Sequence, residues 1–183
     1  MLLRFIVKIQ RLMKKRLTLI LVFFSLIISA SCKMESSSNE FERSYNAWLK
    51  FKAESQNCYN YSVITSSFTG FATETIIYVQ NGQVVKRSFK STTQHSGPPI
   101  VVQEEWIENE ANLNSHQQGA STLTLEEVYA EVRNNWLKKR NKATTYFESK
   151  HNDMISLAGY EEDGCQDDCF RGITIGFIAK IQY

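Results

Sequence analysis

The sequence predicts an α+β domain, in which an antiparallel β-sheet has two helices packed on one face. Three observations predict this class. Two segments carry apolar residues at helical spacing, and seven others are short runs that read as strands, some of them β-branched-rich and some alternating. Tight turns join neighbouring strand-like runs directly, which favours antiparallel pairing. The predicted order is α-β-β-β-β-α-β-β-β within residues 41–183, which we take as one domain because chains of ~100–200 residues usually form one.

The first helix is predicted to begin at Asn39, a candidate N-cap with Glu42 three residues later, and to end near residue 56. Its apolar residues fall close to one face of the helix: Phe41, Tyr45, Trp48, Leu49 and Phe51.

Four strands are predicted next, over residues 59–64, 73–80, 83–90 and 100–107. Asn81-Gly82 joins the second and third, and this dipeptide is typical of a hairpin because both turn positions require positive φ. Residues 91–99 hold both prolines and are expected to form a loop.

The second helix is predicted from the capping box of Thr124 and Glu127. Its buried stripe comprises Leu125, Val128, Tyr129, Val132 and Trp136. Residues 138–140, two lysines and an arginine, are expected in its last turn, where they would oppose the helix dipole.

Three closing strands are predicted over residues 144–149, 154–158 and 173–181. The last has a regular alternation, and one set of its side chains is expected to face the core: Ile173, Ile175, Phe177, Ala179 and Ile181.

The amino-terminal segment reads as an export signal. An apolar stretch over residues 17–30 follows a basic cluster, and only 16 residues between Arg16 and Lys33 lack charge. A membrane-spanning helix needs about 20 apolar residues, so a cleaved signal over residues 1–31 is the better interpretation. Translation from Met13 rather than Met1 would still supply a complete signal.

Small residues lead directly into Cys32, and this arrangement resembles the lipobox of bacterial lipoproteins. The resemblance implies that Cys32 is acylated and tethers the chain to a membrane through the polar segment 32–40. Lys33 follows where an Asp would retain a lipoprotein in the inner membrane, so the outer membrane is expected, facing either the periplasm or the cell surface. The alternative is an ordinary signal peptide with an incidental cysteine.

The net charge disfavours nucleic acid as a partner. The chain has a formal charge of +2, but six basic residues and no acid lie in the first 31 positions. Without this segment, 15 basic residues face 19 acidic ones, which gives −4. A basic surface for phosphate contacts is therefore not expected.

Three cysteines remain after Cys32, and an exported compartment permits disulfides. Cys165 and Cys169 are close enough in sequence to bridge within a loop, while Cys58 paired with either one is the alternative. The same loop is acidic and includes Asp167 and Asp168. Its spacing does not match an EF-hand, so neither a metal nor another cofactor is expected.

His116 is the best single candidate for a general base or a ligand contact, and Asp167 and Asp168 are the other candidates for a ligand site. The sequence holds no nucleophile elbow, P-loop, HExxH or GxGxxG motif. A solvated loop histidine is the simpler interpretation of His116.

Several short motifs together resemble a family of uncharacterised bacterial secreted and lipoprotein domains, defined only as a domain of unknown function. The matching residues are Trp48, Tyr59-Asn60-Tyr61, residues 79–84, residues 124–129, Tyr146-Phe147-Glu148, Gly159-Tyr160 and Asp167-Asp168-Cys169. Glu161 stands where the family has proline, and the family has no established catalytic residues to transfer.

The sequence therefore predicts a lipid-anchored, non-enzymatic binding module for an unidentified protein, peptide or glycan. The alternative is a hydrolase-like enzyme centred on His116 and the acidic loop.

Overall fold

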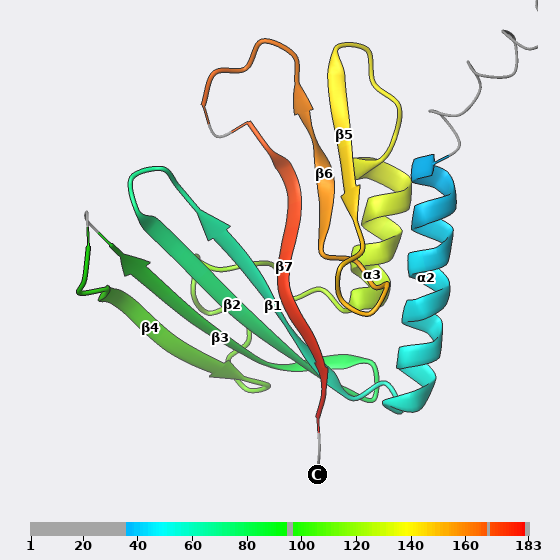
Figure 1. Cartoon of the computed structure of the whole chain (residues 1–183). Helices are drawn as coiled ribbons and strands as arrows, with labels where there is room; N and C mark the ends of the chain where they lie inside the picture. Colours follow the sequence, from blue (N-terminus) through cyan, green and yellow to red (C-terminus); the bar gives the residue numbers. More distant parts are fainter. Residues whose placement is uncertain (1–35, 95–96, 168, 182–183) are drawn as a thin grey trace, which may run out of the picture. The chain divides into compact units, whose positions relative to one another are not determined.

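The described residues fold into a seven-stranded antiparallel β-sheet with two α-helices, which confirms the α+β class (Figure 1). The computed structural model describes residues 36–94, 97–167 and 169–181. A compact unit extends from Glu40 to Tyr183. Within the described residues, no helix combines the length and apolarity that a membrane crossing requires. The predicted signal segment 1–31 lies outside the described residues.

The first half of the described chain contains one helix and four strands. These are α2 (Ser36–Glu54), β1 (Tyr59–Ser66), β2 (Phe71–Gln80), β3 (Gln83–Thr93) and β4 (Val101–Asn109). The Asn81-Gly82 turn has positive φ at both positions, as the sequence predicts. β3 continues through Thr93, so it takes up three residues of the predicted loop because they pair with β4.

The second half contains a helix that widens into a π-helical turn, followed by three further strands. These are α3 (Leu125–Glu131), the π-helical turn η2 (Val132–Trp136), β5 (Ala143–Glu148), β6 (Leu157–Glu162) and β7 (Arg171–Lys180). The capping box is confirmed: Thr124 Oγ1 accepts from the Glu127 N–H, and the Glu127 carboxylate accepts from the Thr124 N–H.

The sheet has the strand order β4-β3-β2-β1-β7-β6-β5. β1 therefore pairs with β2 on one side and with β7, from the other end of the described chain, on its other side. The two groups of strands are joined only through this β1–β7 ladder (Figure 1).

The largest side chains buried in the core are aromatic. The Trp48 ring is fully buried and lies 5.1 Å from the Tyr59 ring and 6.2 Å from the Tyr129 ring, between centroids. The tyrosine hydroxyls are paired: Tyr59 Oη accepts from the Leu125 N–H at 2.9 Å, and Tyr61 Oη donates to the Leu123 carbonyl at 2.5 Å. Burial raises the pKa of Tyr129 to about 12 and keeps its hydroxyl protonated.

Further predicted boundaries are wrong. α2 begins at Ser36 rather than at Asn39, so it takes up part of the segment 32–40 predicted as a tether. The second helix ends before the basic run 138–140, because the Arg140 guanidinium donates to the carbonyls of Asn135 and Trp136 at the helix end.

The predicted strand 154–158 is displaced, since β6 begins only at Leu157. Met154 and Ile155 are buried, which explains their apolar character, but their backbone follows the turn at residues 152–153 and lies outside the named strands. Met154 bridges to His151, and the Ile155 N–H donates to Tyr129 Oη.

The predicted alternation of the last strand fails halfway along β7. The β1–β7 register shifts between Ser62 and Val63, a β-bulge that places Gly176 against Ser62. Ile173 and Ile175 are buried as expected, but after the bulge Ile178 packs against the core while Ala179 is exposed.

Candidate functional site

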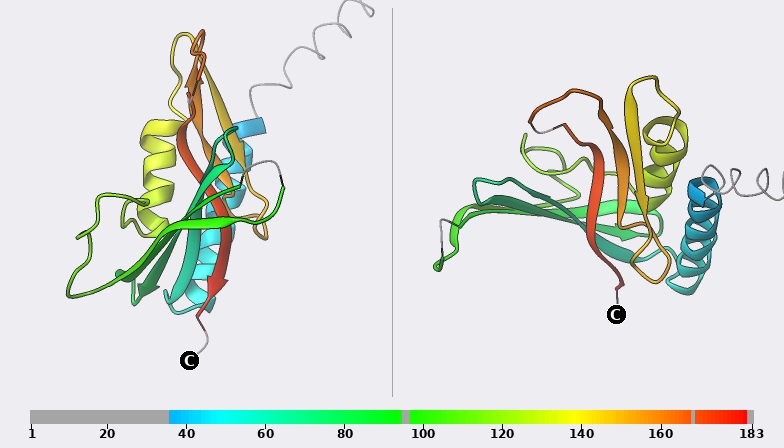
Figure 2. Two further views of the ribbon diagram at one scale, coloured as in Figure 1. Left: turned by 90° about the vertical axis from the view of Figure 1, so that its left-hand side faces the viewer. Right: turned by 45° about the horizontal axis from the view of Figure 1, so that its top comes forward.

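The candidate site lies where β1 and β7 separate. Their ladder ends at the pair of Val63 and Ile175, and residues 64–66 of β1 diverge from residues 171–174 of β7. We call this divergence the split. Figure 1 and the right-hand view of Figure 2 show the two strands together at one end and apart at the other.

Glycines on β7 permit the change of direction. A Cβ at Gly176 would lie 2.6 Å from Ser62 Oγ, so the close approach at the bulge requires glycine. A Cβ at Gly172 would lie 2.1 Å from the Ala158 carbonyl oxygen, so β7 can approach β6 this closely only without a side chain. β7 therefore turns toward β6 as it leaves β1.

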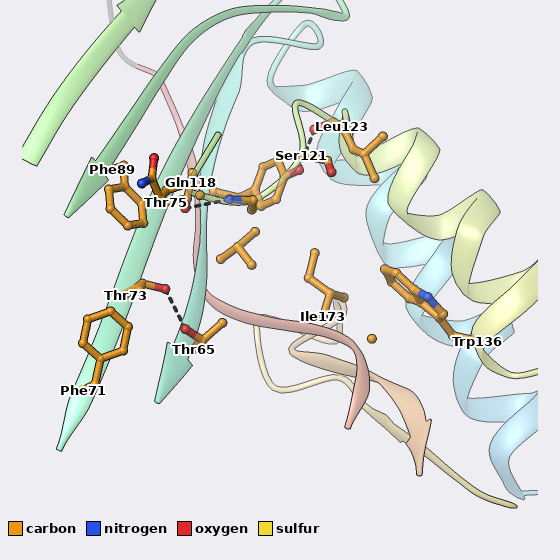
Figure 3. Close-up of a pocket in the computed structure, with 15 residues that line it drawn as sticks. Thr65, Phe71, Thr73, Thr75, Phe89, Gln118, Ser121, Leu123, Trp136 and Ile173 are labelled. Carbon is orange, nitrogen blue, oxygen red and sulfur yellow. Dashed lines mark hydrogen bonds between the residues drawn. The ribbon is translucent and has the colours of Figure 1, made fainter. Parts of the chain in front are cut away.

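On one side of the split is a cavity of about 510 Å³, the inner cavity (Figure 3). Its lining is mostly apolar and threonine-rich: Tyr61, Val63, Thr65, Phe71, Thr73, Thr75, Phe89, Gln118, Gly119, Ala120, Ser121, Leu123, Trp136, Gly172 and Ile173. Figure 3 shows Thr65 and Thr73 on the strands of one wall, with Ile173 and Trp136 on the other side. Its size and character are those of a small-molecule or side-chain site.

A second hollow of about 1010 Å³, the outer groove, shares five lining residues with the inner cavity. The shared residues are Val63, Thr65, Thr73, Gly172 and Ile173. The outer groove adds charged side chains, among them Glu74, Lys90 and Glu161. Because both hollows include residues of β1 and β7, they meet in the split.

The loop between β4 and α3 forms part of the wall of the inner cavity and is fixed in place. The Ala120 N–H donates to Thr75 Oγ1 at 3.0 Å, and its carbonyl accepts from Arg87 Nη1 at 2.9 Å. Arg87 Nη2 also donates to the His116 carbonyl at 3.1 Å. A side chain from the sheet therefore fixes both ends of this stretch of loop.

Arg87 in turn is paired with Glu108, and both are buried. Arg87 Nε and Nη2 donate to the two carboxylate oxygens of Glu108 at 2.8 and 2.9 Å. The backbone N–H groups of Asn114 and His116 donate to the same carboxylate. These donors, Arg87 first among them, hold the pKa of Glu108 far below its ordinary value, so the carboxylate is charged at neutral pH.

His116 takes part in this network instead of facing either hollow. Its Nδ1 lies 3.0 Å from Glu108 Oε1, and its ring stacks on Trp106 with centroids 4.2 Å apart and planes 7° from parallel. The His116 side chain is 37% exposed. It lines neither the inner cavity nor the outer groove. Its neighbours therefore account for its polar contacts without a substrate.

The acidic loop is separate from His116. The disulfide between Cys165 and Cys169 is formed, Cys58 is a free thiol, and Asp167 is exposed. Asp168 and Cys32 lie outside the described residues. In the described part of the chain, no hydrogen bond or ion pair joins His116 to this loop, and no group of three or more His, Cys, Asp or Glu side chains could hold a metal ion.

The sequence does not predict the inner cavity or the Arg87–Glu108 pair. One signal was available: Arg87 and Glu108 occupy core-facing positions at or beside predicted strands, in phase with Phe89 and Trp106. A charged side chain at such a position is rarely buried without a partner.

A second carboxylate joins the two helices. Glu126 of α3 accepts from Lys52 Nζ at 2.6 Å, from Tyr45 Oη at 3.0 Å and from Trp48 Nε1 at 3.3 Å. The Lys52 ammonium is the main reason that the pKa of Glu126 is lowered. This cluster fixes α2 to α3 and is not part of the split.

No protein-family model, no curated protein and no solved structure matches the chain.

Proposed function

We propose that this protein is a lipid-anchored, non-enzymatic binding module of a bacterial envelope, and that the split with its two hollows is the binding site. The observation that carries the proposal is the lining of the inner cavity. Among the described residues that line it there is no carboxylate, histidine, cysteine or amine, and the one phenol, Tyr61, donates to the Leu123 carbonyl. Such a lining suits an apolar group held by contact, with threonine and backbone groups to orient it.

The fixed loop supports binding by a preformed site. Ala120 is held by Thr75 and Arg87, so the cavity wall does not have to be ordered when a ligand enters. Avoiding that entropic cost leaves more of the contact energy as affinity.

We infer also that both helices lie on one face of the sheet, in the predicted α-β-β-β-β-α-β-β-β order. Trp48 of α2 and Leu125 of α3 both reach Tyr59 of β1, one through its ring and the other through its N–H, which supports this arrangement. Side chains of Ile64, Glu74 and Lys90 then belong to the face without helices, where the outer groove is open.

The lipid anchor is tested by substituting Cys32, which lies outside the described residues. We expect Cys32→Ser to move the full chain from the membrane fraction to the soluble fraction and to abolish incorporation of a labelled fatty acid. A Cys58→Ser variant is the matched control and should remain in the membrane fraction. A Cys32→Ser protein that stays membrane-bound and labelled would contradict the anchor.

The binding site is tested with Nile red, a neutral dye that fluoresces in apolar surroundings. Thr65 is exposed and lines both hollows, so Thr65→Arg places a charge at their junction. We expect the dye to bind the wild-type domain and to bind Thr65→Arg at least tenfold more weakly. Thr145→Arg, at an exposed position of β5 outside both linings, is the control. Equal dye binding by both variants would contradict the proposed site.

The alternative, a hydrolase-like activity centred on His116 and the acidic loop, has less support. His116 lines neither hollow, and the adjacent carboxylate is occupied by Arg87.

A further inference from the structure

The backbone edges that border the split indicate what kind of ligand it takes. The proposal made here rests on the binding function above and makes it more specific. We propose that the split binds an extended peptide, which pairs with residues 64–66 of β1 as an added antiparallel strand.

The direction of the β1 backbone follows from its hairpin with β2. The Ser67 N–H donates to the Phe71 carbonyl at 2.8 Å, so residues 65 and 67 direct their backbone groups toward β2. Backbone groups alternate in direction along a strand. The carbonyl of Ile64 and both backbone groups of Ser66 therefore face the split, beyond the last β1–β7 pair.

The border of the split formed by β7 also directs backbone hydrogen-bonding groups into it. The Ile175 N–H donates to the Ser156 carbonyl at 2.8 Å, so residues 173 and 175 direct their backbone groups toward β6. By the same alternation, Gly172 directs its backbone N–H and carbonyl into the split. Two strand edges thus face each other across a hollow.

Side chains of an added strand would enter the two hollows alternately, because successive side chains point to opposite faces of a sheet. One set would enter the inner cavity, whose walls include Phe89, Leu123 and Trp136. The other set would lie in the outer groove near Glu74 and Lys90. The expected peptide has a large apolar or aromatic residue at every second position near its centre, with polar residues between.

This arrangement favours a peptide over a glycan or a small apolar molecule. A cavity alone would suit any compact apolar group. A carbonyl and an N–H/carbonyl pair spaced two residues apart along an edge match the repeat of another polypeptide strand, as in other cases of strand addition. The peptide backbone would then provide affinity and the inner cavity would select the side chain.

The first experiment selects peptides from a random decapeptide display library with the purified wild-type domain. Enriched peptides are synthesised, and their binding is measured by titration. Ser66→Pro is the test variant, because proline removes the Ser66 N–H that faces the split but no N–H that pairs with β2. Ser66→Ala, which keeps the N–H, is the matched control.

We expect peptides with alternating apolar residues to bind wild type and Ser66→Ala within about twofold of each other. Ser66→Pro should bind about tenfold more weakly, the loss that one removed hydrogen bond causes. Equal binding to Ser66→Pro and Ser66→Ala would overturn strand addition at β1.

A second measurement uses the wild-type protein and does not depend on how Ser66→Pro folds. Each peptide is N-methylated at one backbone position at a time. The N–H groups that pair with the carbonyls of Ile64 and Ser66 lie two residues apart, so methylation at these two positions should weaken binding about tenfold each. Methylation at the position between them should have less than a twofold effect. A pattern without this alternation would overturn the proposal.

Different results would contradict the proposed binding function and the strand-addition inference. If Nile red binds in a Thr65-dependent manner but no peptide is enriched, the site binds apolar groups and the strand-addition inference is wrong. If neither the dye nor any peptide binds, the proposed function itself is wrong.

Discussion

The two ends of β1 differ in strand pairing and in burial. Between Tyr59 and Val63 the strand is paired on both sides, and its tyrosines are fully buried with bonded hydroxyls. From Ile64 to Ser66 it is paired only with β2, and all three side chains are exposed. One strand therefore contributes stability at one end and an accessible edge at the other.

This difference implies that stability and binding can be altered separately. Substitutions around the closed end should lower the free energy of unfolding, and those at the open end should change binding only.

The largest loss is expected from Trp48→Ala, because the ring is fully buried against Tyr59 and Tyr129. Truncating a buried Trp leaves a cavity and costs about 3–5 kcal/mol. Urea denaturation measures it. Leu49→Ala, next to it on α2 and 41% exposed, should cost less than about 1 kcal/mol. Similar losses for both would show that the core is not centred on Trp48.

Arg87→Met should cost about 3 kcal/mol, because it leaves the buried Glu108 carboxylate without its main partner. Replacing both partners, with Arg87→Met and Glu108→Leu together, removes the unpaired charge and should recover part of the loss. A double variant less stable than either single one would contradict this account.

The same pair predicts a pH dependence. The folded-state pKa of Glu108 is lowered, so its stabilising effect is complete above the unfolded-state value of about 4.5 and is lost as pH falls further. The stability difference between wild type and Glu108→Gln should therefore narrow as pH falls below about 4.5. Denaturation of both proteins across this range measures it, and a difference that widens in acid would contradict the prediction.

Glu126→Gln should cost less than about 1 kcal/mol, because this carboxylate is partly exposed and its ion pair with Lys52 is screened. The loss should shrink as salt is added, whereas the loss from Arg87→Met should not. A loss of stability that does not depend on salt would mean that the Glu126–Lys52 pair is shielded from dissolved ions, as the Glu108–Arg87 pair is.

The smallest effect on stability is expected at the open end. Thr65→Arg should change the free energy of unfolding by less than about 0.5 kcal/mol, since Thr65 is exposed. Thermal melts of Thr65→Arg and Thr145→Arg beside wild type measure it. A large loss for Thr65→Arg alone would show that the open end also stabilises the fold.

Local signals were sufficient to predict much of the fold. The capping box at Thr124 and the turn at Asn81-Gly82 each depend on residues within three positions of one another, and both form as expected. The disulfide between Cys165 and Cys169 is equally local.

Features that depend on distant partners could not be predicted. The bulge at Gly176 exists because β7 must pass Ser62, which is more than 100 residues earlier in the chain, and it reverses the alternation that the sequence alone predicts. Arg87 and Glu108 come into contact only when β3 and β4 pair. The loop between β4 and α3 then places His116 against Glu108. The position of the split is the point where β1 and β7 separate. The sequence of either strand alone does not determine that point.

The sheet order also has a consequence for how the domain is made. β1 and β7 are the first and last described strands, yet they lie side by side at the centre of the sheet. Pairs this far apart in sequence form slowly, because a long loop must close before any contact forms. During synthesis β1 can pair with β2 early, but its β7-facing edge stays unpaired and exposed until β7 has emerged.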